Sequence, residues 1–532
     1  MPVAVSFPGV YVEELPSGVR AITGVATSIT AFVGRAAKGT EDATTINSFG
    51  DFERRFGSLD PAYPMSYSVR DFFGNGGAQA VIVRLFKKKA GEGVVDTAKI
   101  SRTNLDLLAA SRGSWANTLR VRVDDKVSAE IATRYGLVAG DLFNLTVRDS
   151  VSGAMETFLN VTVKESPRRI DRVLANESAL LRVATAMPGS LVPPKHADTP
   201  AAGKTIWTDD TTSTGVAAAD QATDSDPLDL AAYQGSDADK TGIFALRKTD
   251  LFNLLCIPPD TREGDTLASV YSSALDFCVQ RRAMLIVDSP AAWKSANDIV
   301  KNNNAALGDL NLTGERSRNA ALFFPRLIEP DPRRDGQLDT FAASGAIAGQ
   351  MARTDTNRGV WKAPAGVDAA ISGAQGLSVS LTNEENGQLN PLGVNCLRSF
   401  PIIGSVAWGA RTMRGADLLA DEYKYIPVRR TALYIEESLY RGLQWVVFEP
   451  NDEPLWAQIR LNAGAFMHNL FRQGAFQGSS PRDAYFVKCD KESTTQNDIN
   501  LGIVNVVVGF APLKPAEFVI IKLQQMAGQI DV

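Results

Sequence analysis

The chain of 532 residues is poor in the side chains that most often carry catalysis and metal binding. It has four cysteines and two histidines, His196 and His468. The cysteines are scattered with no C-x-x-C pair, so the sequence predicts reduced thiols in a cytoplasm and not a disulfide framework. Zinc sites need cysteine or histidine pairs at ligand spacing. The sequence therefore predicts neither a metal site nor a cofactor, and structural or solvated roles for both histidines.

The motifs of nucleotide and acyl chemistry are also missing. There is no G-x-S-x-G elbow and no G-x-x-x-x-G-K-[ST] phosphate loop, and the nearest approach to G-x-G-x-x-G, "GNGGAQ", ends in Gln79. We therefore expect that the protein is not an enzyme. An α/β domain that recognises a small ligand is the competing interpretation from a different class.

Long apolar runs and an excess of one charge are lacking too. Runs such as "IVNVVVGFA" fall far short of the about 20 residues that cross a bilayer, and "MPVAVSFPGVYVEEL" has no basic signal region. Lys and Arg total 55 against 60 Asp and Glu, a net charge of −5. The sequence predicts a soluble cytoplasmic product without stable membrane insertion and without direct nucleic-acid contact. Apolar residues make up 44%, enough for sizeable cores.

The first pattern along the chain is an alternation of strand-like and helix-like segments. A strand-like run, "ITGVATSITAFVGRA", is followed by helical stretches at Phe49–Phe56 and Ser66–Phe73 and by a strand at Ala80–Leu85. The order returns in "LFNLLCIPP", "LASVYSSALDFCVQRR", "AMLIVDSP" and "AALFFPRLI". This pattern predicts a mixed α/β, multidomain fold with a βαβ-type core and a parallel sheet, split by an insertion.

The insertion is predicted to be β-rich. "NTLRVRV", "LFNLTVRD" and "ETFLNVTV" alternate as strands, and the turn-like "SVSGAM" joins the last two in an antiparallel hairpin. Ser166 and Pro167 suit the N-cap and first position of a helix over "PRRIDRVLANESALLRV".

An acidic stretch, residues 196–242, follows. It holds nine Asp and no Glu among many Ala, Thr and Gly, so we expect a mobile, solvated excursion that is dispensable for assembly. A calcium loop at "DSDPLD" is the sharper alternative, but the glycine of an EF-hand loop is absent.

Both ends of the chain carry strand-like segments with restricted pairing. Prolines bracket "GVYVEEL" near the start, and "APLKP" precedes "AEFVIIKL" near the end. Proline cannot donate to a sheet ladder, so these are predicted edge strands. Between them, "VRRTALYIEESLYRGL" and "PLWAQIRLNAGAFMHNLFRQG" have helical periodicity.

Several of these motifs together resemble the contractile tail sheath proteins of bacteriophages and related injection machines. They are "SFPGVYVEELPSGVRAITGVATSITAFVGRA", "GSWANTLRV", "ARTDTNRGVWKAPAG", "VAWGARTM", "YKYIPVRRTALYIEESL", "WVVFEPNDEPLW" and "GFAPLKPAEFVIIKLQQ". The resemblance covers residues 1–183 and 233–532, and Ala116 departs from it where the family often has Gly. Trp361, Trp408 and Trp456 lie in these motifs and are expected to be packing residues.

The resemblance implies a structural subunit that polymerises helically around a tail tube and contracts to drive the tube through the host envelope for genome ejection. The alternative within the family is the sheath of a host-encoded contractile injection system. The implied partners are further sheath subunits, the tail tube protein, and the baseplate and tail terminator proteins. The implied location is the tail of a virion assembled in the host cytoplasm.

The resemblance also implies arms that pair between subunits by β-strand addition. The implied arm residues are Val10, Tyr11, Val12 and Glu13 at one end, and Phe518, Val519, Ile520 and Ile521 at the other. Arg460 and Arg472, on the helical stretch 453–474, are the candidate tube contacts, and a core helix with solvated arginines is the competing interpretation.

By this interpretation the chain divides into an N-terminal arm and α/β, inserted and C-terminal parts. The expected bounds are 1–22 for the N-terminal arm strand, 23–90 and 241–380 for the two parts of the α/β domain, 91–240 for the outward-projecting insertion, 381–510 for an inner tube-facing domain, and 511–532 for the C-terminal arm strand.

Overall fold

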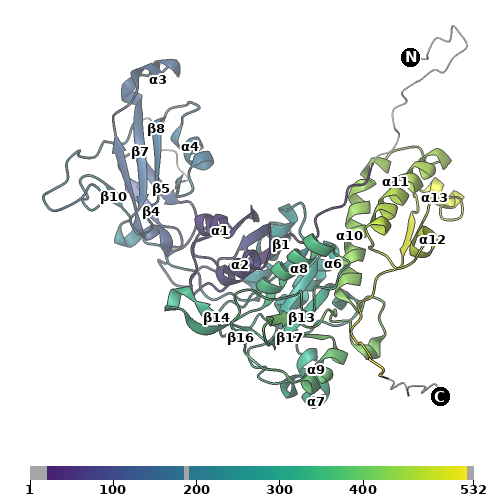
Figure 1. Ribbon diagram of the computed structural model, residues 1–532. Coiled ribbons are helices and arrows are strands. Elements are labelled where there is room, and N and C mark those ends of the chain that lie inside the picture. The colour runs from purple at the N-terminus through teal and green to yellow at the C-terminus, as the bar shows by residue number, and fades with distance from the viewer. Residues whose placement is uncertain (1–20, 185–190, 524–532) are drawn as a thin grey trace, which may run out of the picture.

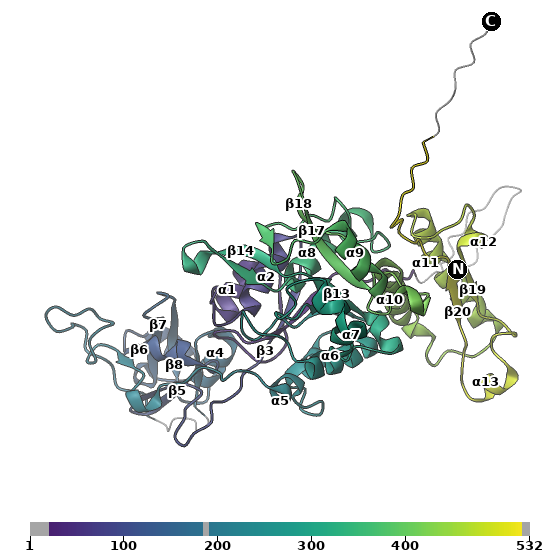
Figure 2. The same cartoon turned by 90° about the horizontal axis from the view of Figure 1, so that it is seen from below.

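The computed structural model describes residues 21–184 and 191–523, which form three connected parts (Figure 1). An α/β core lies between a β-rich projecting unit, built mainly from residues 98–225, and a C-terminal unit, built from residues 426–510. The two units stand on opposite sides of the core (Figures 1 and 2). This arrangement confirms the predicted mixed α/β, multidomain fold.

An eight-stranded sheet forms the core, in the order β18-β17-β13-β12-β11-β1-β3-β2. Its strands are β1 Thr30–Gly34, β2 Thr44–Ile46, β3 Ala80–Arg84, β11 Leu254–Cys256, β12 Met284–Asp288, β13 Ala320–Phe324, β17 Val394–Phe400 and β18 Gly404–Ala407. The strands from β17 to β3 run parallel, and the edge strands β18 and β2 are antiparallel to their neighbours. Since β11 pairs with β1 across the insertion, the predicted single sheet split by an inserted unit is confirmed.

Helices cover both faces of this sheet because its strands are apolar on both sides. One face carries α1 Phe49–Phe56, α2 Met65–Gly74 and α8 Ser344–Arg358, and the other carries α5 Leu230–Gln234, α6 Ala268–Gln280, α7 Asn297–Gly308 and α9 Asn383–Leu389. Along β1, Phe32 packs toward α2 while Ala31 and Val33 pack toward α6. Gly345 lets α8 approach α2 closely, since a Cβ there would stand 2.1 Å from the Ser68 carbonyl oxygen.

A small sheet, β15-β14-β16, packs beside α2. Its strands are β14 Leu327–Asp331, β15 Gln337–Phe341 and β16 Gly376–Leu377. The rings of Tyr67 on α2 and Phe341 on β15 lie 5.1 Å apart, centroid to centroid.

The projecting unit holds two antiparallel sheets, β10-β6-β7-β8 and β4-β5-β9. Its elements are β4 Lys99–Arg102, β5 Leu105–Ala109, β6 Leu119–Asp124, α3 Ala129–Arg134, β7 Leu142–Asp149, β8 Met155–Thr162, α4 Ile170–Glu177, β9 Leu181–Val183 and β10 Thr214–Gly215. The predicted hairpin is β7–β8. The predicted helix, with Ser166 as N-cap, Pro167 as first residue and its end in "LLRV", is wrong at both ends, because α4 covers only Ile170–Glu177. The Ser166 carbonyl and hydroxyl instead close a turn by accepting the N–H groups of Arg169 and Arg168, and the chain returns to a strand at Leu181.

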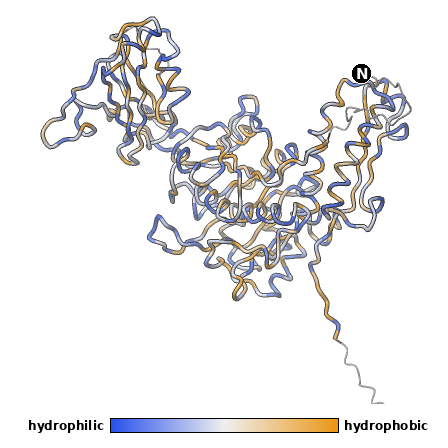
Figure 3. The backbone as a smooth tube through the Cα atoms, turned by 45° about the horizontal axis from the view of Figure 1, so that its top comes forward, coloured by the Kyte–Doolittle hydropathy of each residue, from blue (hydrophilic) through white to orange (hydrophobic). Residues whose placement is uncertain are grey.

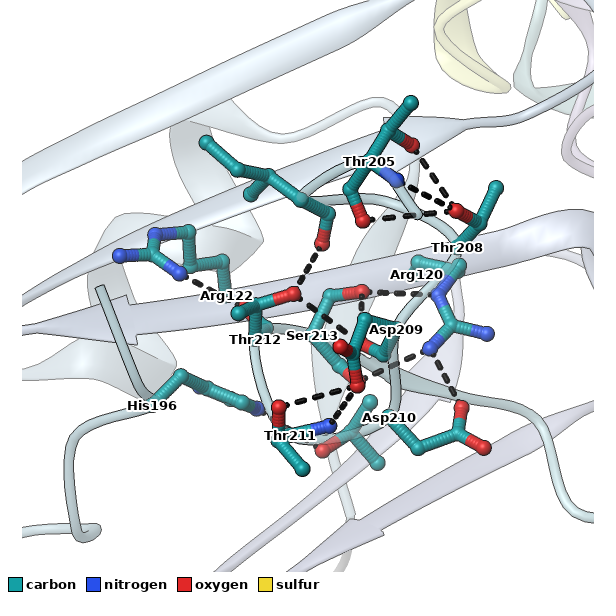
Figure 4. A network of polar contacts seen from close by, with 12 residues as sticks. Arg120, Arg122, His196, Thr205, Thr208, Asp209, Asp210, Thr211, Thr212 and Ser213 are labelled. Atoms are coloured by element: carbon teal, nitrogen blue, oxygen red, sulfur yellow. Dashed lines mark hydrogen bonds and ion pairs between the residues drawn. The ribbon is translucent and has the colours of Figure 1, made fainter. Parts of the chain in front are cut away.

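The acidic stretch 196–242 is only in part the solvated excursion that its composition suggested, because some of its residues are buried in the projecting unit. β10 extends the sheet beside β6, and His196, Asp209 and Thr212 are buried. Figure 4 shows the polar network around Asp209 and Thr212. Asp209 accepts the N–H groups of Ala201 and Thr211 at 2.7 and 3.0 Å, so this carboxylate closes a loop. The composition predicted exposure to solvent because aspartate side chains are usually exposed. In the structure, backbone N–H groups donate to Asp209, and arginines on β6 pair with Asp198 and Asp210.

The later part of the stretch is tied to the core in the same way. Tyr233 on α5 is buried against the sheet, and Asp229 caps α5 by accepting the N–H of Ala232. Asp224, within the suggested calcium loop, accepts hydrogen bonds from the N–H and hydroxyl of Ser114. Over residues 21–184 and 191–523 no group of three or more His, Cys, Asp or Glu side chains has an arrangement that would hold a metal ion.

His196 is buried in the projecting unit and hydrogen-bonded through both ring nitrogens. Its Nδ1 accepts the Val123 N–H at 2.9 Å, so the neutral ring carries its proton on Nε2, which lies 2.9 Å from Thr214 Oγ1. Burial, and next the positive charge of Arg102, lower the pKa of His196 to about 4. A second ring proton would point at the Val123 N–H, so protonation breaks this contact.

We therefore expect residues 196–215 to loosen as the pH falls from about 6.5 toward 4. The unfolded chain binds the proton first in this window, so the stability present above about pH 6.5 is lost on acidification. Hydrogen exchange of peptides from 196–215 should accelerate there beyond the intrinsic rate change. His196→Gln, which keeps one acceptor and one donor, should flatten the profile, and His468→Gln on the exposed face of α11 is the matched control. An unchanged profile in His196→Gln would assign the acid response to another group.

The C-terminal unit contains α10 Ile426–Gly442, α11 Glu453–Arg472, α12 Pro481–Ala484, β19 Tyr485–Lys488, α13 Gln496–Asn500 and β20 Val507–Phe510. The structure divides the chain differently from the expected bounds at two places. β17 and β18 belong to the core sheet and not to an inner domain starting at residue 381, and α5, within the expected insertion 91–240, packs on the core sheet. None of the helices among the described residues has the length and apolarity needed to cross a membrane.

Candidate interaction site

The chain beyond β20 is an extended segment, residues 511–523, which we call the C-terminal arm. It leaves the C-terminal unit and runs past the edge of the core (Figures 2 and 3). Five large apolar side chains on it are between 76% and 93% exposed: Phe518, Val519, Ile520, Ile521 and Leu523. Burying such a side chain contributes about 1.5–3 kcal/mol. A contiguous exposed set of this kind is typical of a surface that another protein covers.

One residue, Glu517, fixes the arm to the core. Its carboxylate accepts two hydrogen bonds from Arg411, at 2.8 Å from Nε and 2.6 Å from Nη2, and one from the Tyr425 hydroxyl at 3.3 Å. The Arg411 side chain is fully buried, and its Nη1 also donates to the Asn390 carbonyl and to Asp417, both at 2.9 Å. Two parallel bonds fix orientation as well as position. This ion pair therefore sets the direction in which the arm leaves the core.

A groove of about 950 Å³ lies between the arm and the body of the protein. Trp361 and Trp408 line it from the core, and Phe518 and Val519 line it from the arm. Trp408 packs on Phe400, with ring centroids 4.6 Å apart, and is also 39% exposed, so part of its ring is open to the groove. Three cationic side chains also line the groove: Arg358, Lys362 and Lys514. The groove thus combines aromatic walls with positive charge.

The hairpin β19–β20 is a second surface with unused pairing capacity. It is a two-stranded sheet, and no third strand pairs with it among the described residues. Phe486 and Val507 are 55% and 46% exposed. A two-stranded sheet is marginal in water, and a strand from another chain extends such an edge readily.

The predicted N-terminal arm strand lies outside the described residues. Its predicted pairing residues are Val10, Tyr11, Val12 and Glu13. The described chain begins against the C-terminal unit: Ile22 is buried beside Gly442 on α10, and the Val25 N–H donates to Ser438 Oγ at 3.2 Å. The start of the described chain and the C-terminal unit therefore lie together.

Arg460 and Arg472 occupy different environments on α11. Arg460 pairs with Glu453 at 2.6 Å and donates to the Cys489 carbonyl, which makes it part of the unit's own structure. Arg472 is exposed, and the described residues supply no ion pair to it. Of the two, Arg472 is the more available for a partner. Trp456, also on α11, is buried as predicted and donates to Asn451.

All four cysteines are buried and free, and burial raises the pKa of the Cys489 thiol to about 11. At the carboxyl end of β3, where parallel sheets usually bind ligands, Arg84 donates instead to the carbonyls of Ala36, Gly39 and Arg112 at 2.9, 2.9 and 2.7 Å. This position is used to join the core to the projecting unit.

The comparisons with known proteins agree with this architecture. Residues 420–525, which include the C-terminal unit and the arm, match the family model "Phage tail sheath C-terminal domain". No curated protein matches the chain in sequence. Among solved structures, the fold is similar to the helical sheath of the anti-feeding prophage in its contracted state, with 23% identity, a TM-score of 0.55, and coverage of 98% of this chain and 100% of that one.

Two further structures extend the likeness. The sheath complex of PVC, an extracellular contractile injection system, in its contracted state is 21% identical with a TM-score of 0.55, and 98% of each chain is covered. The sheath tail protein Lin1278 from Listeria innocua is 12% identical with a TM-score of 0.57, and 93% of this chain and 96% of that one are covered. Residues 420–525 thus match a sheath C-terminal domain, and the fold of the chain is similar to that of solved sheath proteins. The resemblance to the contractile tail sheath family is confirmed.

The anchor of the arm was not identified from the sequence. Arg411 lies in "VAWGARTM" and Glu517 in "APLKPAEFV", and both stretches contributed to the family resemblance. No periodicity connects them, because 106 positions separate the two partners.

Proposed function

We propose that this chain is the subunit of a contractile sheath, which polymerises helically and surrounds a tail tube. The observation that carries the proposal is the anchored, exposed apolar arm, residues 511–523, within a region that matches the sheath C-terminal domain. A heterologous contact repeated by a rotation that does not close generates a filament. An arm that leaves one subunit and completes a sheet edge on the next is a contact of this kind.

The hairpin β19–β20 is the proposed acceptor. Its open edge takes an arm strand from a neighbouring subunit, and the segment Val10–Glu13 supplies the second strand from another copy. Baseplate and terminator proteins would close the two ends of the filament. Arg472 is the proposed tube contact, because Arg460 is engaged within its own unit. Contraction then needs two packings of the same subunits, with the arms as tethers.

In the primary form of the proposal, the chain forms the tail sheath of a virion. This sheath is assembled in the host cytoplasm and used for genome ejection. The sheath of a host-encoded injection system is the second form, favoured by the likeness to the anti-feeding prophage and PVC structures. Capsid and portal genes beside this gene would support the first, and toxin or immunity genes the second.

The proposal is tested by size-exclusion chromatography and negative-stain microscopy of the purified chain. We expect long hollow tubes. Phe518→Asp combined with Ile520→Asp should leave dispersed, folded particles, because two charges on the arm prevent its burial. The matched control, Met155→Asp with Leu159→Asp on the exposed edge of β8, should still form tubes. Dispersed globules of the unmodified chain under all conditions, or tubes from the arm variant, would contradict the proposal.

A further inference from the structure

Two carboxyl groups outside the interaction site share one arginine inside the protein. Asp71 on α2 and Glu329 on β14 are 6% and 1% exposed. Arg70 donates to Asp71 Oδ1 at 2.8 Å from Nε and to Glu329 Oε2 at 2.5 Å from Nη2. The remaining oxygens, Asp71 Oδ2 and Glu329 Oε1, are buried and accept no hydrogen bond from the described residues. Arg70 Nη2 lies 2.7 Å from Asp71 Oδ1 and 2.5 Å from Glu329 Oε2, so one guanidinium nitrogen brings the two carboxyl groups next to each other.

The charges around this pair do not balance without a further positive charge. Four carboxyl groups belong to the network, namely Asp71 on α2, Glu329 and Asp331 on β14, and Asp339 on β15, against three arginines, Arg70 on α2, Arg262 in the loop after β11 and Arg334 before β15. Tyr67 on α2 is the other titratable group, and its hydroxyl donates to Asp331 at 2.8 Å. Arg334 and Asp339 lie at the rim of the network, 53% and 24% exposed. The three buried carboxyl groups, Asp71, Glu329 and Asp331, therefore face two arginines, Arg70 and Arg262, which leaves one negative charge in a buried site, and this is costly.

Geometry decides which carboxyl groups lack compensation. Arg262 donates to both Asp331 and Asp339 at 2.7 Å, and these bonds lower the pKa of each carboxyl group despite its burial. Asp71 and Glu329 have only Arg70 between them. One proton on this pair of carboxyl groups would turn an orphaned oxygen into a donor and neutralise the excess charge.

We propose that Asp71 and Glu329 form a proton-binding site, in which one shared proton holds the small sheet β15-β14-β16 against α2. The pair is a clamp between two elements distant in the sequence, with α2 part of the core and β14 the central strand of the small sheet. Loss of the proton leaves two adjacent buried carboxylates that repel each other across this junction. The clamp is therefore closed at low pH and weakened at high pH.

The direction of the pH effect follows from the proton balance. Burial, and next the charge of Asp71, raise the pKa of Glu329 to about 8, from an ordinary value of 4.5. Between these two values the folded chain holds a proton that the unfolded chain has released. Stability therefore falls as the pH rises through this window, by about tenfold in the folded-to-unfolded ratio per pH unit, and levels off above it.

The test is thermal unfolding of the full chain between pH 5 and pH 9, with hydrogen exchange of peptides from β14 and β15. Glu329→Gln and Asp71→Asn each place an amide donor where the proton would be. We expect each single variant to match the unmodified chain near pH 5, to exceed its stability above pH 8, and to lose most of the downward slope. The double variant should be less stable at every pH, because Arg70 then has no carboxylate partner.

Asp339→Asn is the matched control on the same small sheet. It removes a carboxylate that Arg262 already compensates, so it should lower stability at neutral and alkaline pH alike and keep the downward slope. A second buried acid, Asp288, also has a pKa raised by burial, and its response persists in all these variants. Parallel pH profiles of the unmodified chain, Glu329→Gln and Asp71→Asn, or unchanged exchange of β14 peptides between pH 6 and 9, would overturn the proposal. If one single variant does not fold, the other decides.

Discussion

Glu517→Gln is expected to reduce tube formation sharply while leaving the protein folded. The variant keeps the size of the side chain but removes the charge that Arg411 binds through two hydrogen bonds. Hydrogen bonds to charged groups contribute about 1.5–3 kcal/mol each, and Arg411 keeps Asp417 and a backbone carbonyl as partners. We therefore expect a loss of about 2–3 kcal/mol in the binding of the arm to the core.

The reason for a large effect on assembly is geometric. An arm without its anchor samples many directions, so each lattice contact must first order it, and that cost recurs at every subunit. Arg411→Lys should have a similar effect, because an ammonium group cannot form the two parallel bonds. Glu517→Gln is the more specific test of the two, because Arg411 is fully buried and a shorter cation also leaves its other partners without hydrogen bonds.

The measurement is tube yield by sedimentation and electron microscopy, with circular dichroism of the unassembled chain as the test of folding. Glu384→Gln, an exposed carboxylate in the first turn of α9, is the matched control and should assemble normally. Unmodified tube yield from Glu517→Gln would show that the arm is directed by its partner and not by Arg411.

Replacement of residues 196–215 by a short Gly/Ser linker is expected to destabilise the projecting unit. The composition of the acidic stretch favours dispensability for assembly, whereas its contacts predict a role in the stability of the projecting unit. The linker removes strand β10 and the hydrogen bonds that Arg120 makes with Ser213 and Arg122 makes with Thr212. It also exposes the buried surface under His196.

At about 0.5–1.5 kcal/mol for each of several hydrogen bonds, we expect a loss of roughly 3–6 kcal/mol in this unit. Differential scanning calorimetry should show a separate, earlier transition, with the core transition nearly unchanged, because β6, β7 and β8 form a core of their own. Inserting the same linker at the turn Val151–Gly153 between β7 and β8 is the control, since that turn is exposed. A linker variant with a single unchanged transition would restore the solvated interpretation.

Much of the fold was determined by the sequence itself. The alternation and length of the apolar runs predicted the parallel core strands, the hairpin β7–β8 and the helices α1, α10 and α11, because each pattern reports whether a segment is buried on one face or two. The split of the core by an insertion followed from the return of the same strand–helix order. The sheath resemblance rested on motifs near the ends, and the family match at 420–525 falls on one of them.

Other features were decided only by tertiary structure, because they depend on partners far apart in the chain. Arg411 meets Glu517 across 106 positions, and Arg70 meets Glu329 across 259. Local composition has no information on such pairs. Local composition predicted that the acidic stretch is exposed to solvent. Part of it is buried, and arginines on β6 donate hydrogen bonds to it. A local pattern determines which side of a segment is apolar, whereas the environment of a charge is set by whatever the folded chain brings within hydrogen-bonding distance.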